Sequence, residues 1–91
     1  MKKIKTQVVA IYIPVQYLHL SLDEIRTHLF NGYVLRKRKL TKFEGNSARI
    51  DCRLDKAFWK MLKLHAKKEN ITVRELTESI LFTELSNQYG S

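Results

Sequence analysis

A strictly alternating segment in the second half of the chain constrains the fold more than any other feature. From residue 48 to residue 54, apolar and polar side chains alternate without a break. The apolar positions are Ile50, Cys52 and Leu54, and the charged positions are Arg49, Asp51 and Arg53. Successive side chains of a β-strand point to opposite faces. The pattern therefore predicts a strand with one buried face and one exposed, charged face.

Two helices are predicted after this strand. Asp55 is a suitable N-cap for the first helix, and apolar residues then recur at helical spacing until Asn70, which tolerates the left-handed conformation that ends helices. Thr72 and Glu75 have the spacing of a capping box and predict the start of the second helix. The apolar residues of the second helix cover more of its surface than a single surface helix needs.

One strand and two helices cannot form a stable unit alone, because the strand has no partner and the helices expose a wide apolar face. A second copy of the chain would resolve both problems. We therefore expect an α+β fold built as an intertwined homodimer. In it, two strands pair into an antiparallel ribbon over four helices, and residues 46–91 form this domain.

Residues 1–45 predict a smaller strand-helix-strand extension. β-formers from residue 4 to residue 13 predict a buried strand that ends at Pro14, and residues 15–20 predict a second short strand. Ser21 with Glu24 predicts a capped helix that stops at Gly32. Residues 33–43 predict a further strand, and residues 44–47 predict a turn or linker.

The charge of the chain favours a polyanionic partner. Seventeen Lys and Arg against nine Asp and Glu give a formal net charge of +8. No apolar run approaches the roughly 20 residues of a membrane span. Cys52 is the only cysteine, so no internal disulfide is possible and a cytoplasmic setting is expected. The chain shows no arrangement of residues typical of an enzyme, and the three histidines are too far apart in sequence to predict a metal site. We expect no cofactor.

A two-stranded ribbon fits the major groove of B-DNA. Arg49 and Arg53 can bridge O6 and N7 of guanine, and Asp51 can accept a hydrogen bond from N4 of cytosine. At the start of the second helix, the Thr72 hydroxyl and the free amides of Val73 and Arg74 are suited to bind phosphate. We therefore predict base contacts from the strand and phosphate contacts from the helix.

The segment 49–55, followed by about a dozen helical residues and the segment 70–76, resembles the ribbon-helix-helix superfamily of the Arc and Met repressors and the plasmid copy-number repressors. The resemblance covers about half of the chain and implies a dimer that binds double-stranded DNA through its ribbon. It assigns base contact to Arg49, Asp51 and Arg53, and phosphate contact to the start of the second helix. Many members have Gly where Asn70 stands, and many begin at the strand.

The functional prediction is a sequence-specific, nucleoid-associated DNA-binding protein, most simply a transcriptional repressor. Two alternatives remain open: a plasmid accessory protein that marks a transfer origin or centromere, and a protein-interaction module in residues 1–45 that the DNA-binding unit delivers. A basic run predicts flanking phosphate contacts, against the alternative of a solvated surface, and consists of Arg36, Lys37, Arg38 and Lys39. We expect Cys52 to be a core residue and His65 to be packed and hydrogen-bonded.

Overall fold

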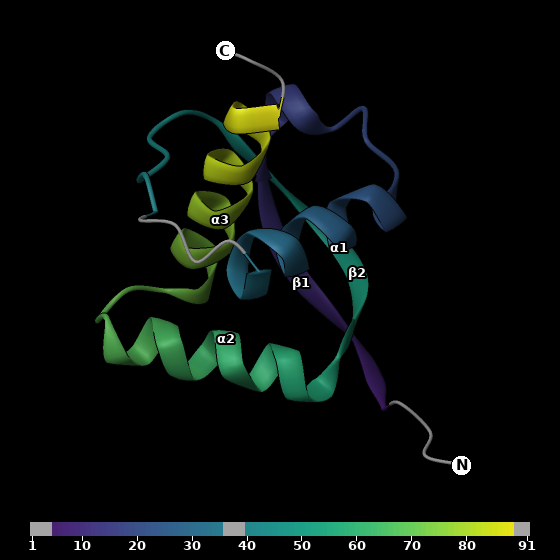
Figure 1. Cartoon of the computed structure of the whole chain (residues 1–91), viewed down its shortest axis with the longest axis vertical. Coiled ribbons are helices and arrows are strands. Elements are labelled where there is room, and N and C mark those ends of the chain that lie inside the picture. The colour runs from purple at the N-terminus through teal and green to yellow at the C-terminus, as the bar shows by residue number, and fades with distance from the viewer. Residues whose placement is uncertain (1–4, 36–39, 89–91) are drawn as a thin grey trace.

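The computed structural model describes residues 5–35 and 40–88. Two strands, β1 (Thr6–Pro14) and β2 (Ser47–Asp55), form the sheet. Three α-helices pack with it: α1 (Leu22–Phe30), α2 (Lys56–Lys68) and α3 (Val73–Gln88). A short 3-10 helix, η1 (Val15–Tyr17), follows β1, and a π-helical turn, η2 (Asn31–Leu35), follows α1. The fold is thus α+β, with β2, α2 and α3 in the predicted order (Figure 1).

The antiparallel partner of β2 is β1 of the same chain. The two strands pair over their whole length, from Thr6 opposite Asp55 to Pro14 opposite Ser47. We had expected the strand of a second chain at this position. The first half of the sequence instead supplies the mate, so both halves of the chain contribute to one sheet.

The inner face of the sheet carries the core. Val9, Ile11 and Ile13 of β1 are buried, as are Cys52 and Leu54 of β2. The alternate residues of both strands point to the opposite face, where Val8 is 59% exposed. The prediction that β1 is a wholly buried strand is therefore wrong, because only one of its faces is covered.

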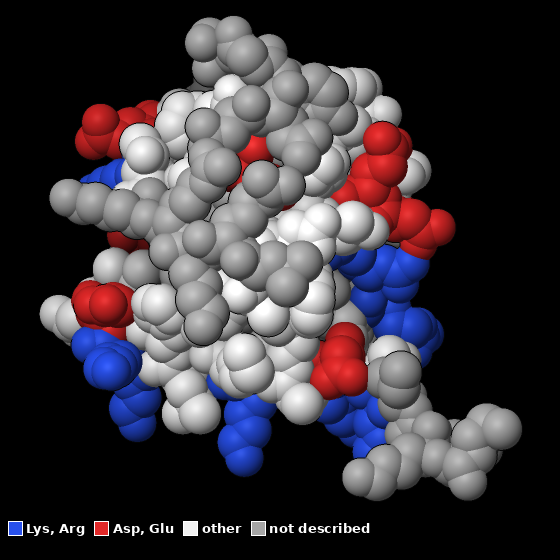
Figure 2. Space-filling view, in the orientation of Figure 1, with Lys and Arg blue, Asp and Glu red and all other residues white. Residues whose placement is uncertain are grey.

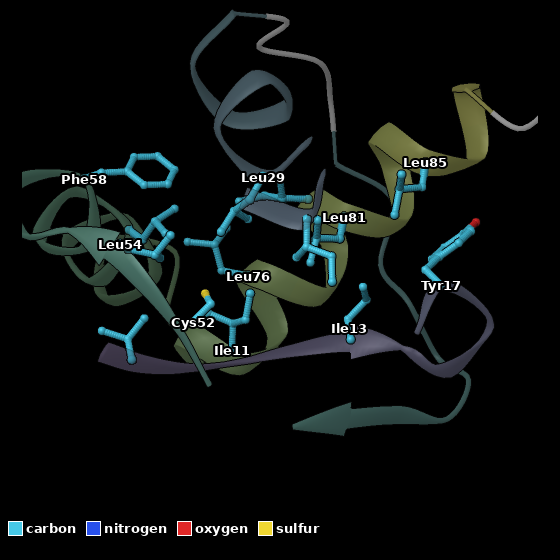
Figure 3. Close-up of a cluster of buried hydrophobic side chains, with 14 of the residues drawn as sticks. Ile11, Ile13, Tyr17, Leu29, Cys52, Leu54, Phe58, Leu76, Leu81 and Leu85 are labelled. Carbon is cyan, nitrogen blue, oxygen red and sulfur yellow. The ribbon is translucent and has the colours of Figure 1, made fainter. Parts of the chain in front are cut away.

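Helix α3 lies at the centre of the molecule. Its residues Leu76, Ile80, Leu81 and Leu85 have no exposed surface, and they pack among side chains of β1, α1 and α2 (Figure 3). Helix α3 packs mainly against β1 and next against α1. The wide apolar surface of this helix, which we had expected a second chain to cover, is thus packed within the chain.

The predicted helix ends are confirmed where side chains cap them. Ser21 and Glu24 form a complete capping box at the start of α1. The Asp55 carboxylate accepts hydrogen bonds from two amides at the start of α2, at 2.7 and 3.2 Å. Asn70 has a φ of 59°, the left-handed conformation that ends a helix. The Thr72 hydroxyl accepts a hydrogen bond from the Glu75 amide at 3.0 Å.

The expected strand-helix-strand extension is corrected in three places. Residues 15–17 form a 3-10 helix where a second strand was predicted, and residues 31–35 form a π-helical turn where a third strand was to begin. Residues 40–46 contain no strand. Gly32 does not stop the helical path. It lets η2 approach α3, because a Cβ at Gly32 would lie only 3.1 Å from Cγ2 of Ile80.

Candidate nucleic-acid interface

The outer face of the sheet carries the three charged residues predicted to contact bases. Helices α1 and α3 pack on the inner face (Figure 1), so Arg49, Asp51 and Arg53 of β2 are exposed. They point to one side because they occupy alternate positions of one strand. The structure therefore brings the three predicted side chains together on one solvent-facing surface.

Two of these side chains form an ion pair along the strand. Nε of Arg49 lies 3.3 Å from Oδ1 of Asp51, and both side chains remain well exposed, at 63% and 59%. An exposed pair of this kind contributes little stability and is easily rearranged. Arg53 makes a longer hydrogen bond of 3.4 Å to the Thr6 hydroxyl on β1. These contacts hold the side chains near the sheet while their hydrogen-bonding groups stay accessible.

Strand β1 supplies the other half of the outer face, which the sequence pattern did not indicate. In the sheet register, Val8 lies opposite Arg53, Ala10 opposite Asp51, and Tyr12 opposite Arg49. Directly opposite residues point to the same face of a sheet. The surface is thus asymmetric, with charged residues on β2 beside an apolar row on β1 that ends in a tyrosine.

The amino end of α3 reaches this same surface through Arg74. The guanidinium carbon of Arg74 lies 4.3 Å from the centroid of the Tyr12 ring, and its terminal nitrogen donates to the Ser47 hydroxyl at 3.4 Å. Nε of Arg74 lies 3.5 Å from a carboxylate oxygen of Glu78. The predicted phosphate-binding end of the helix therefore adjoins the predicted base-contacting face, with Tyr12 between them.

The edge of β2 that faces away from β1 is open at Arg49 and Asp51, whereas the main-chain oxygen of Arg53 accepts a hydrogen bond of 3.4 Å from Nη1 of Arg26 on α1. The ladder bonds Val15 N–H to Asn46 O and Lys56 N–H to Lys5 O continue the strand pairing on either side. Since bonded and non-bonded pairs alternate, the main-chain groups of Arg49 and Asp51 point away from β1. No residue within 5–35 or 40–88 forms a main-chain hydrogen bond with them at this edge.

The opposite edge of the sheet is covered by α3. The Tyr12 amide points to this edge and donates to the Thr77 hydroxyl at 3.4 Å. Pro14, which has no amide proton to donate, also faces this side. The basic run Arg36, Lys37, Arg38 and Lys39 lies outside the described residues.

Cys52 and His65 have the structural roles expected from the sequence. Cys52 is buried under the sheet, and this burial raises the pKa of its thiol. Nδ1 of His65 forms a hydrogen bond of 2.8 Å with the Tyr33 hydroxyl, and the two rings lie 5.4 Å apart. Burial also raises the pKa of Tyr33. Cys52 and the His65–Tyr33 pair lie outside the outer face of the sheet.

In the part of the chain that the structure describes, no three His, Cys, Asp or Glu residues gather as metal ligands would. None of its helices has both the length and the apolar character needed to span a membrane. Comparisons of the chain with protein-family models, with curated proteins and with solved structures give no match.

Proposed function

We propose that this protein binds double-stranded DNA by inserting the β1–β2 sheet, outer face first, into the major groove. The exposed trio on that face, Arg49, Asp51 and Arg53, carries the proposal. These residue types match the edges of G·C pairs in the major groove, where Arg binds guanine and Asp accepts from cytosine. The net charge of +8 adds the electrostatic attraction that any DNA-binding surface requires.

The dimensions of the sheet support insertion by one chain. Two paired strands lie about 4.8 Å apart, and a two-stranded ribbon fits a groove about 12 Å wide. The β1 half of the face would then lie beside the bases as well. Val8 and Ala10 are suited to pack against the C5-methyl group of thymine. The asymmetric face thus favours a site in which G·C pairs adjoin A·T pairs.

The amino end of α3 would bind the DNA backbone beside this site. The Thr72 hydroxyl already caps the helix, and the first amides of the helix carry a partial positive charge. Arg74, stacked on Tyr12, stands between these amides and the sheet. Phosphate contacts from Thr72, Val73 and Arg74 would fix the orientation of the sheet without selecting sequence.

In this proposal the protein is a transcriptional repressor that occupies an operator and blocks polymerase. The arrangement of β2, α2 and α3 supports the proposed relation to ribbon-helix-helix proteins, with β1 as the partner strand. The homodimer stays a prediction. Pairing through the open edge of β2 would give four strands spanning roughly 14 Å, more than the groove admits. The dimer that fits the proposal therefore leaves this edge open.

Sedimentation tests the dimer at micromolar concentration. The expected mass is twice the 10.8 kDa of one chain. Asp51→Pro removes an amide that points to the open edge and none of the hydrogen bonds between β1 and β2, so the expected mass of this variant is unchanged. A dimer that dissociates in Asp51→Pro would show that the open edge is the interface, and would contradict insertion of a two-stranded sheet.

The DNA-binding proposal is tested by comparing variants on two duplexes. A preferred sequence is first selected from a randomised pool, and binding is then measured on it and on random DNA. Arg49→Ala and Arg53→Ala should each cost roughly 1–3 kcal/mol on the preferred sequence and little on random DNA. Thr72→Ala should weaken both complexes equally. Equal losses on both duplexes for all three variants would contradict the proposed division of contacts.

A further inference from the structure

Four lysines form a straight row along α2. Lys56, Lys60, Lys63 and Lys67 follow the i, i+4, i+7, i+11 spacing that places residues on one line of a helix, and all four are exposed. We call these four residues the lysine row. Neighbouring members lie about 5–6 Å apart, and the row spans roughly 16 Å. Lys and Arg side chains project along the lower edge of the molecule in Figure 2, where Figure 1 places α2.

Helix α2 contains no acidic residue that could compensate the charge of the lysine row. Residues 56–68 include no Asp or Glu. None of the four lysines forms an ion pair with a carboxylate of residues 5–35 or 40–88. Like charges at i, i+4 spacing destabilise a helix. The repulsion within the row would be relieved by an anion with several regularly spaced charges.

The row lies on the side of α2 that faces away from α1 and η2. The rings of Phe58 and His65 point toward these elements, since Phe58 contacts Phe30 and His65 contacts Tyr33. At 100° per residue, Lys60 and Lys63 lie about 140–200° around the helix from these rings. The row begins at Lys56, directly after Asp55 at the end of β2, so it adjoins the strand that carries Arg53. We infer that one extended polyanion contacts both surfaces.

The packing of α2 favours a nucleic-acid backbone over an anionic membrane. An amphipathic helix binds a membrane by burying its apolar face among lipids. In α2 that face is occupied, because Phe58, Leu62 and Ala66 are buried in the protein core. Outside that face, the large apolar side chains that α2 exposes are Met61 and Leu64, at 46% and 58%, and two side chains do not form the continuous apolar face of a membrane-bound helix. The evenly spaced phosphates of a duplex match a line of cations without requiring apolar contact.

We propose that the lysine row binds the phosphate backbone of the same DNA duplex whose bases the sheet contacts. This inference rests on the proposed function and extends it, because it adds a backbone contact on α2 that is independent of sequence. The row lies on a different element from the phosphate site at the start of α3. The DNA backbone is thus contacted from two helices, α2 and α3.

The test uses the full-length protein with Lys60→Gln and Lys63→Gln combined. Gln is nearly as good a helix former as Lys, so the helix should be retained, which circular dichroism checks. The control combines Lys42→Gln and Lys68→Gln, which removes the same charge outside the row. Affinity is measured against salt concentration on a random-sequence duplex and on the preferred duplex.

In the row variant, the plot of log affinity against log salt should become shallower by up to about 1.8 in slope. Affinity at 0.1 M salt should decrease by up to roughly 60-fold. The loss should be the same on both duplexes, and the control should change far less. Equal effects of both double variants would overturn the proposal, because net charge alone would explain them. It is also overturned if the row variant retains DNA affinity but loses binding to anionic phospholipid vesicles. If Arg53→Ala leaves base selection unchanged, that separate result contradicts the proposed sheet contact and not the lysine row.

Discussion

The substitution Ile11→Ala measures how much the first half of the chain contributes to the folding stability of the second half. Ile11 is fully buried on the inner face of β1, opposite Ile50 and against the central helix. Truncation of a fully buried isoleucine costs about 2–5 kcal/mol. A chain of this length has a total free energy of unfolding of about 5–14 kcal/mol. The substitution should therefore remove a large part of the stability of the whole protein.

The only tryptophan makes the measurement informative. Trp59 lies in α2, in the other half of the sequence, and packs against the shared core. Urea unfolding followed by Trp59 fluorescence should show a midpoint about 2 M lower in Ile11→Ala, for a typical slope of about 1.5 kcal/mol per M. Val8→Ala, on the exposed face of the same strand, should shift the free energy by less than about 0.5 kcal/mol.

A specific result would refute this reasoning. If residues 46–91 had an independent core, Trp59 would report the same unfolding midpoint in Ile11→Ala as in Val8→Ala. The refuted point would be the single sheet and core shared by the two halves. The outer face would then need a different partner strand beside β2.

Three further predictions follow from single residues. Gly32→Ala should cost about 1–3 kcal/mol in urea unfolding, because its Cβ would lie 3.1 Å from Ile80. Asn70→Ala should lower the melting temperature, because alanine is strained at a φ of 59°, whereas Asn70→Gly should not. Burial raises the pKa of the Cys52 thiol, so that thiol stays protonated in the folded protein where it ionises in the unfolded chain. The stabilisation of the folded protein by this protonated thiol is therefore complete at pH values below the unfolded pKa of about 8.5, and it is lost as the pH rises further. Unfolding free energies measured from pH 7 to 10 should fall more steeply in the wild type than in Cys52→Ala.

The second half of the sequence predicted its own structure well because its signals are local. Alternation from residue 48 to 54 defines β2, and the caps at Asp55 and Thr72 define the starts of two helices. Asn70 likewise takes the backbone conformation expected of it. These features depend on neighbouring residues, so they could be recognised without knowing the partners of each element.

The identity of the partners could not be predicted in this way. The pairing of β1 with β2 joins residues more than 30 positions apart, and nothing in the local pattern distinguishes it from pairing with a second chain. The run from Val8 to Ile13 is uniformly apolar, so the sequence pattern did not indicate that one face of this strand is exposed. Tyr12 therefore gave no sign of its contact with Arg74. The one available signal was that Tyr12 alternates with Ile11 and Ile13, which places its side chain on the opposite face of the strand.

The central claim is that side chains on the outer face of the sheet select bases, and a cycle of protein and DNA changes tests it most directly. One guanine of the preferred sequence is replaced at a time, and the binding of wild type, Arg49→Ala and Arg53→Ala is measured on each duplex. For one guanine, the replacement should cost the wild type roughly 1–3 kcal/mol and cost Arg53→Ala almost nothing. If Arg53→Ala and Arg49→Ala both retain the full penalty at every guanine, the outer face of the sheet does not contact the bases and the account is wrong.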